Sequence, residues 1–115
     1  MSQEVTRPWG SYRVLETGEN YQIKILTINP KSRLSDQRHK YRGETWTPVN
    51  GVLKVNLQEH VTPIAPGRSL SIERGAWHRL ENQSNNPIQV IEIQYGTNFD
   101  ENDVERRADD YGRVD

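Results

Sequence analysis

Residues 50–57 read Asn50-Gly51-Val52-Leu53-Lys54-Val55-Asn56-Leu57. Leu53, Val55 and Leu57 alternate with polar residues, so one face of an extended segment would be apolar and the other polar. The preceding Asn50-Gly51 suits a tight hairpin turn, because both residue types tolerate positive φ. The stretch therefore predicts a half-buried β-strand that begins after a hairpin turn.

Short segments of the same kind recur along the chain. Four more predict strands because they are rich in apolar or β-branched residues and are bounded by turn formers. They are residues 12–15, 21–28, 69–72 and 88–95. In the last of them Gln89, Ile91, Ile93 and Tyr95 share one face. Many short strands separated by Gly and Pro are typical of an all-β sandwich, jelly roll or barrel.

Helices have little support in this sequence. Prolines at positions 30, 48, 63, 66 and 87 argue against any long helix between the strands. Only residues 100–107 predict a helical turn, and they are weakly apolar. Trp46 is expected to pack in the interior, whereas His60 is expected to be an exposed residue near a turn.

Length and composition predict a single domain over residues 1–115, with a core at about 10–96 and a C-terminal tail at 97–115. The 15 basic and 16 acidic side chains nearly cancel, which argues against a nucleic-acid partner. Cysteine is absent, so disulfides and thiolate ligands are excluded. No apolar run approaches a membrane span and no signal-like segment opens the chain, so a cytoplasmic protein without a membrane partner is expected.

Two of the three histidines lie near other potential metal ligands. Gln37 and His39 are two residues apart, so their side chains would project from the same face of a strand. Glu44 follows a gap that contains Gly43, which lets the chain return a carboxylate to that face, and His78 comes after a later turn. Imidazole and carboxylate suit zinc and related ions, and a Gln carbonyl widens the choice. A histidine on a strand is more often packed or solvated than a ligand, so these residues alone leave both interpretations open.

Two motifs add a family resemblance. Gln37-x-His39-x4-Glu44-x6-Gly51 is similar to the first cupin motif, with Gln in place of its first His, and Gly75-x2-His78-x3-Asn82 resembles the second. Over nearly its whole length the chain resembles the cupin domain of type II mannose-6-phosphate isomerases, found alone or at the C-terminus of mannose-1-phosphate guanylyltransferases. The matching stretches are Arg7-Pro8-Trp9-Gly10, Arg33-Leu34-Ser35, Arg42-x-Glu44-x-Trp46, His78-Arg79-Leu80-Glu81-Asn82, Ile91-Glu92-Ile93-Gln94 and Asp109-Asp110-Tyr111-Gly112-Arg113.

The resemblance implies a single-domain cupin, a double-stranded β-helix or jelly-roll barrel. It implies one divalent metal ion held by Gln37, His39, Glu44 and His78, with zinc expected and manganese, cobalt or nickel as alternatives. The implied activity is the interconversion of mannose 6-phosphate and fructose 6-phosphate, which feeds GDP-mannose synthesis. A homodimer is expected as well, because pairing would cover a sheet edge of a small polar chain.

Such an isomerase moves a proton between C1 and C2 of the sugar, so it needs an acid–base group near the metal. Tyr41 and Lys40 are the candidates, although their ordinary pKa values of about 10 would have to be lowered. Arg42, Arg79 and Arg113 are candidates for the phosphate, because a guanidinium binds phosphate bidentately. Each arginine is equally well explained as a surface or tail residue.

The chain also departs from the family pattern. His39-Lys40-Tyr41 stands where the family has a run of histidines, Thr45 where it has another, and Glu73 where the second motif has Pro. The lost imidazoles are potential acid–base groups. Two alternatives therefore stay open: a non-catalytic cupin that keeps its metal and binds a sugar or sugar phosphate, and a different small-molecule cupin enzyme.

Overall fold

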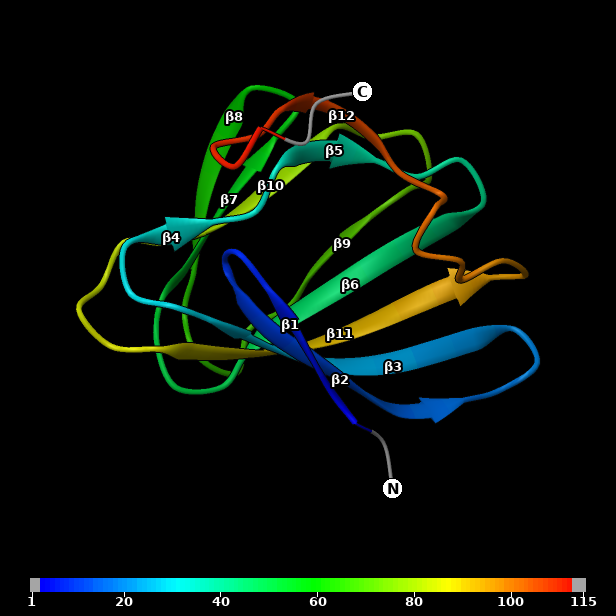
Figure 1. The fold of residues 1–115 in the computed structure, drawn as a ribbon, viewed down its shortest axis with the longest axis horizontal. Helices are drawn as coiled ribbons and strands as arrows, with labels where there is room; N and C mark the ends of the chain where they lie inside the picture. Colours follow the sequence, from blue (N-terminus) through cyan, green and yellow to red (C-terminus); the bar gives the residue numbers. More distant parts are fainter. Residues whose placement is uncertain (1–2, 113–115) are drawn as a thin grey trace.

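Two β-sheets make up the computed structural model, which describes residues 3–112 (Figure 1). The first sheet contains, in spatial order, β1 (Glu4–Arg7), β2 (Gly10–Thr17), β3 (Tyr21–Ile28), β11 (Ile88–Gly96), β6 (Arg42–Pro48) and β9 (Leu70–Ile72). The second contains β12 (Glu105–Ala108), β5 (Asp36–Arg38), β10 (His78–Asn82), β7 (Leu53–Leu57) and β8 (His60–Ile64), and β4 (Ser32–Arg33) pairs with β10. The described residues form no helix, so the all-β prediction is confirmed. Within residues 3–112, accordingly, no helix is long and apolar enough to cross a membrane.

All five predicted strands are present, as β2, β3, β7, β9 and β11. Apolar side chains from both sheets meet in one buried cluster. Ile28, Trp46 and Val90 come from the first sheet and Leu53 and Val55 from the second, and none of the five exposes any surface. Burying such side chains is the main source of stability in a fold of this size. Trp46 packs in the interior as predicted.

Along the inward face of the central strands of the first sheet, the side chains change from apolar at one end to polar at the other. β3 and β11 pair antiparallel, and Ile28 lies opposite Ile88 at the apolar end of the ladder. Toward the other end, Lys24 lies opposite Glu92, and both side chains are buried. Gln94 continues this polar row on β11. The space between the sheets is therefore a hydrophobic core at one end and a polar compartment at the other.

The predicted hairpin at Asn50-Gly51 is wrong. The turn leads from β6 in the first sheet to β7 in the second, so it joins strands that are not paired. Neither residue has a positive φ. A Cβ on Gly51 would instead lie 2.8 Å from Cγ1 of Ile88, so close packing requires the glycine. The hairpin forms one strand later, between β7 and β8, where Gln58 and Glu59 have φ values of 47° and 72°.

The predicted helical turn at residues 100–107 is also wrong. The chain turns at residues 101–102 and then forms β12, which pairs antiparallel with β5. An edge strand such as β5 presents unpaired backbone groups, and β12 satisfies them. An ion pair of 2.8 Å between Arg38 and Glu105 supports the same pairing. Residues 105–108, within the segment 97–115 expected to be a tail, therefore form a strand of the second sheet.

Candidate metal centre and its cavity

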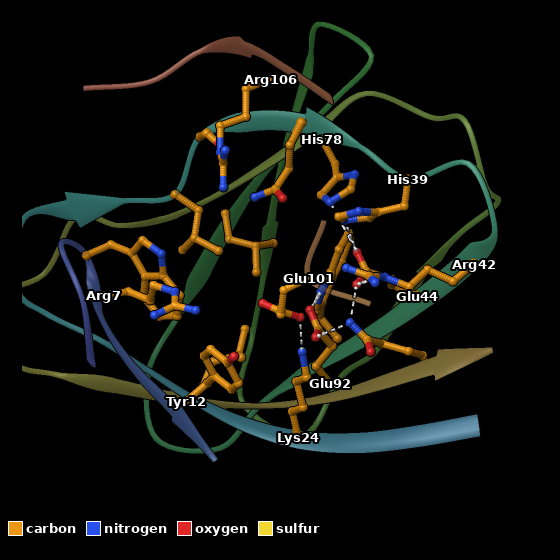
Figure 2. Close-up of a pocket in the computed structure, with 18 residues that line it drawn as sticks. Arg7, Tyr12, Lys24, His39, Arg42, Glu44, His78, Glu92, Glu101 and Arg106 are labelled. Atoms are coloured by element: carbon orange, nitrogen blue, oxygen red, sulfur yellow. Dashed lines mark hydrogen bonds and ion pairs between the residues drawn. The ribbon is translucent and has the colours of Figure 1, made fainter. Parts of the chain in front are cut away.

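β6, β10 and the residue after β5 bring together three of the four predicted metal ligands. Nε2 of His39 lies 3.2 Å from Oε1 of Glu44, and Nε2 of His78 lies 3.1 Å from the same oxygen (Figure 2). The potential ligand atoms of the three residues all lie within 4.8 Å of one another. None of the three side chains is more than 5% exposed. The arrangement is a compact, buried cluster of metal donors.

Backbone carbonyls orient both imidazoles. Nδ1 of His39 lies 2.7 Å from the carbonyl oxygen of Asp103, and Nδ1 of His78 lies 3.0 Å from that of Ala76. Because a carbonyl oxygen only accepts, each Nδ1 carries the hydrogen and donates it. In the neutral imidazole, Nε2 then holds a lone pair directed at the cluster. A metal-binding histidine is typically held in this way by its other nitrogen.

The charges of the cluster also fit a cation. Burial opposes ionisation of Glu44, but the neighbouring His39 and His78 outweigh it and hold the pKa of this carboxyl well below its usual value. Burial likewise disfavours a charged His39, yet the charge of Glu44 and its hydrogen bond raise the pKa of this imidazole above the ordinary value. An ionised carboxylate beside two imidazole nitrogens is a donor set that suits zinc and related divalent ions.

Gln37 lies next to this cluster. It is directly opposite His78 in the ladder between β5 and β10, and directly opposed residues project from the same face of a sheet. Gln37 also lines the cavity that the three donors line. Its role as a fourth ligand stays a prediction.

The cluster lies at one end of a polar cavity of about 70 Å³ (Figure 2). Residues of both sheets and of the segment after β11 line this cavity. Its charged lining residues are Arg7, Lys24, Arg42, Glu44, Glu92, Glu101 and Arg106.

Glu92 is a second carboxyl in the cavity, and sequence reasoning assigned it no role. Its Oε2 accepts a 2.9 Å hydrogen bond from Nε1 of Trp46. Nε2 of Gln94 donates both to Oε1 of Glu92, at 3.1 Å, and to Oε2 of Glu44, at 3.0 Å. Burial, followed by the charge of Glu44, raises the pKa of Glu92 from 4.5 to about 7. The sequence feature that could have indicated Glu92 is its alternation, together with Gln94, with the apolar Ile91 and Ile93.

Lys24 is another charged group of the cavity that the sequence left unassigned, and it lies within the largely apolar strand β3. Its side chain is only 4% exposed, and Nζ forms a 2.6 Å ion pair with Oε2 of Glu101. The same Nζ lies 4.5 Å from the centre of the Tyr12 ring, a distance that allows a cation–π interaction.

The structure does not bring Tyr41 and Lys40 to the cavity, which neither residue lines. Tyr41 is 43% exposed, and Nζ of Lys40 lies 5.3 Å from the centre of its ring. The backbone N–H groups of both residues donate to the carboxylate of Asp103. This segment thus holds the chain after β11 in place, and its two side chains lie outside the site.

The three candidate phosphate ligands differ in position. Arg42 lines the cavity, with Nε 3.7 Å from Oε2 of Glu44, and its Nη1 donates to the carbonyl oxygen of Asp100. Arg79 does not line it: its Nε donates to the carbonyl oxygen of Leu34 and its Nη2 to that of Ala108. Arg79 therefore holds the C-terminal strand. Arg113 lies outside the described residues.

Known proteins resemble this chain in sequence and in structure. It is 41% identical over 114 residues to the mannose-1-phosphate guanylyltransferase ManC of Salmonella typhimurium. The aligned region covers 99% of this chain and 24% of that protein. The chain is 40% identical to the alginate biosynthesis protein AlgA of Pseudomonas putida, over 96% of this chain and 23% of that one. The chain thus spans about a quarter of the length of these relatives.

Among solved structures, a cupin-2 domain protein from Rhodospirillum rubrum superposes with a TM-score of 0.73 at 13% identity, over 82% of this chain and 69% of that one. This likeness shows the cupin fold. The profile of the family "Mannose-6-phosphate isomerase C-terminal" matches residues 1–109, nearly the whole chain. The chain accordingly belongs to the mannose-6-phosphate isomerase C-terminal family of cupin domains.

Proposed function

We propose that the chain is a metal-dependent isomerase that interconverts mannose 6-phosphate and fructose 6-phosphate, as a step toward GDP-mannose. One observation carries the proposal: a cluster of metal donors and a separate carboxyl with a pKa of about 7, Glu92, line the same cavity. Aldose–ketose interconversion needs this pair of elements, because one polarises the carbonyl group and the other moves the proton.

His39, Glu44 and His78 would hold the metal, zinc by the character of these donors, with Gln37 as the fourth ligand. A divalent ion bound there would supply the positive charge that polarises the carbonyl group of the sugar. The carbonyls of Asp103 and Ala76 orient the two imidazoles so that Nε2 of each lies near Oε1 of Glu44. The protein's own contribution is this fixed orientation in a buried compartment.

Glu92 would carry the proton. As a carboxylate it takes the proton from C2 of the aldose, and the electron pair of that C–H bond forms the C1=C2 bond of the enediol while the π pair of the C1 carbonyl moves onto O1. The proton on O2 passes to O1, and the electron pair left on O2 forms the C2 carbonyl as the C1=C2 pair takes a proton at C1. Glu92 returns its proton to C1 in this step, which yields the ketose. A pKa near 7 suits this exchange, because the group can both take up and release a proton near neutral pH. Trp46 and Gln94 hold its two oxygens in position.

The second candidate function is binding without turnover, and it is favoured by Lys40, Tyr41 and Thr45, which stand where the resembled family has histidines that could act as acid–base groups. Either function requires room for the ligand. Sites for small-molecule ligands usually measure on the order of 300–1,000 Å³, whereas this cavity measures about 70 Å³. A sugar phosphate therefore requires the cavity to widen. Glu101 belongs to the segment after β11 and forms the ion pair with Lys24, so widening at this point would break that pair.

Proton exchange separates the two functions. We expect metal-loaded protein, incubated with mannose 6-phosphate in deuterated water, to remove the NMR signal of the C2 proton. This readout reports enediol formation even when net conversion is slow. Saturable binding of the sugar phosphate without exchange would instead establish the binding module. Absence of both exchange and binding would overturn both functions.

We also propose a homodimer that uses the outer face of the first sheet. Ile25 and Ile91 lie directly opposite each other there, next to the pair Ile23 and Ile93, and all four side chains are half-buried. A second copy would cover these apolar columns. Ile25→Glu is expected to convert the dimer to a monomer by light scattering, and Thr62→Glu, exposed on β8, is the matched control. A wild-type monomer at micromolar concentration would contradict the dimer.

A further inference from the structure

The charges of the cavity are unequally paired. Lys24 is paired with Glu101 at 2.6 Å, and Arg42 lies beside Glu44 and donates to a backbone carbonyl. Within residues 3–112, Arg7 and Arg106 line the cavity but have no carboxylate at ion-pair distance. The cavity thus contains two guanidinium groups whose charge no described carboxylate balances.

Arg106 has an unused donor inside the protein. Its Nε is buried and has no hydrogen-bond partner among the described residues. The residue lies opposite Gln37 in the ladder between β12 and β5, so its side chain shares a face with this predicted metal ligand. A buried donor of a charged group costs desolvation free energy unless an acceptor meets it. An anion in the cavity would be such an acceptor.

Arg7 approaches from the other sheet. Its Cζ lies 5.4 Å from the centre of the Tyr12 ring, which is also within cation–π distance of Lys24. Its one hydrogen bond within the described part of the chain goes from Nη1 to the neighbouring carbonyl of Thr6. The aromatic ring thus supports the guanidinium while most of its donors stay free for a ligand.

The two arginines line the cavity from different sheets. β1, which carries Arg7, is an edge strand of the first sheet, and β12, which carries Arg106, is an edge strand of the second. Figure 2 shows both side chains on the side of the cavity away from His39 and Glu44. The cavity therefore has a metal-binding end and a cationic end.

We propose that Arg7 and Arg106 form an anion site that binds the phosphate group of the substrate. The inference rests on the proposed function and names the residues that select a phosphorylated sugar. In a hexose 6-phosphate the reacting carbons, C1 and C2, lie at the opposite end of the carbon chain from the phosphate. The cavity is arranged in the same way, with the metal donors at one end and the two arginines at the other. Two guanidinium forks match the oxygens of a phosphate better than ammonium groups do, because each fork donates two parallel hydrogen bonds.

Arg106→Gln tests the anion site directly in the metal-loaded protein. We expect affinity for mannose 6-phosphate and for inorganic phosphate, measured by calorimetry, to fall on the order of 10- to 100-fold, the usual effect of losing a charged hydrogen bond. KM should rise more than kcat falls, because a remote phosphate contact stabilises substrate and transition state alike. Arg106→Lys should recover part of the affinity.

Arg107→Gln is the matched control. Arg107 is the next residue along β12, but it is exposed, forms an ion pair with Asp36 and lies over the ring of Trp77. Its loss should leave phosphate affinity unchanged. Arg7→Gln is a second, independent test from the other sheet. If Arg106→Gln fails to fold, the phosphate affinity of Arg7→Gln decides whether the anion site exists.

The outcomes separate this inference from the proposed function. Wild-type affinity for mannose 6-phosphate in both Arg7→Gln and Arg106→Gln would overturn the anion site even if proton exchange continued. Weakened binding in the two variants would support the site even if the wild type showed no exchange. A wild-type protein that binds neither mannose 6-phosphate nor inorganic phosphate would overturn the anion site as well.

Discussion

His78→Ala is expected to lower the affinity for the metal on the order of 100-fold or more. Even residues that only orient a ligand change metal affinity by about 10- to 100-fold when mutated, so loss of a ligand should exceed that range. The variant removes one of two imidazole nitrogens that face Oε1 of Glu44. Metal content after dialysis and a chelator competition titration measure the effect.

His60→Ala provides the control for this experiment. His60 begins β8 and is exposed, as predicted from the sequence, and it does not line the cavity. Its substitution should leave metal content and affinity unchanged. Should His78→Ala remain folded and keep the wild-type affinity, the metal centre would have to lie elsewhere. Glu44→Gln is expected to resemble His78→Ala, because it removes the negative charge that the two histidines share.

Glu92→Gln is expected to abolish C2 proton exchange while the metal stays bound. A positioned acid–base group accelerates proton transfer by about 10²- to 10⁴-fold, and an amide cannot take up the proton. The glutamine is close in size to the native side chain and can still accept a hydrogen bond from Trp46. Glu81→Gln, on β10 and outside the cavity lining, is the matched control. Unchanged exchange in Glu92→Gln would exclude this carboxyl as the base.

The pH dependence of proton exchange in the wild type has a defined sign. Because the carboxylate is the active form of a base, exchange in the wild type should rise with pH through the pKa of Glu92. That pKa is about 7 without metal, and burial and the charge of Glu44 are its causes. A bound cation would offset the charge of Glu44, so the rising limb should lie below pH 7 in the loaded protein.

Stability of the metal-free protein gives an independent measure of this pKa. The folded protein holds the Glu92 proton more tightly than the unfolded chain, whose pKa is near 4.5. Glu92 therefore contributes stability that is complete below pH 4.5 and is lost as pH rises to about 7. Urea unfolding should show Glu92→Gln gaining about 3 kcal/mol relative to the wild type between pH 4 and pH 8. A constant difference between the two proteins would contradict the raised pKa.

Strand positions were predictable because alternation and turn residues are local properties of the chain. The prediction for residues 21–28 matches β3, and that for residues 88–95 falls one residue short of β11. The turn at Asn50-Gly51 was predictable as a turn but not as a crossing between sheets. The composition of this turn fits a hairpin, but whether the two strands it joins pair with each other depends on which sheet each strand enters.

The candidate site was predictable only in part. Residue types and spacing indicated Gln37, His39, Glu44 and His78 as potential ligands but left a packed or solvated role open, and the resemblance to the cupin motifs favoured the metal site. The positions of Tyr41 and Lys40 were not predictable, because both lie in the connection between β5 and β6, and neither side chain lines the cavity. Closeness along the sequence to a ligand does not place a side chain in the site.

The sequence by itself determined the all-β class, the positions of five strands and the donors that converge as His39, Glu44 and His78. Only the tertiary structure decided which face of β11 is buried, so that Ile91 and Ile93 lie outside and Glu92 lies inside. It also decided that the segment after β11 lines the cavity, because Glu101 of this segment pairs with Lys24, which lies 77 residues away along the chain. Alternation reveals that a strand has two faces but not which one meets the other sheet, and burial, which raises the pKa of Glu92, exists only once the sheets have packed.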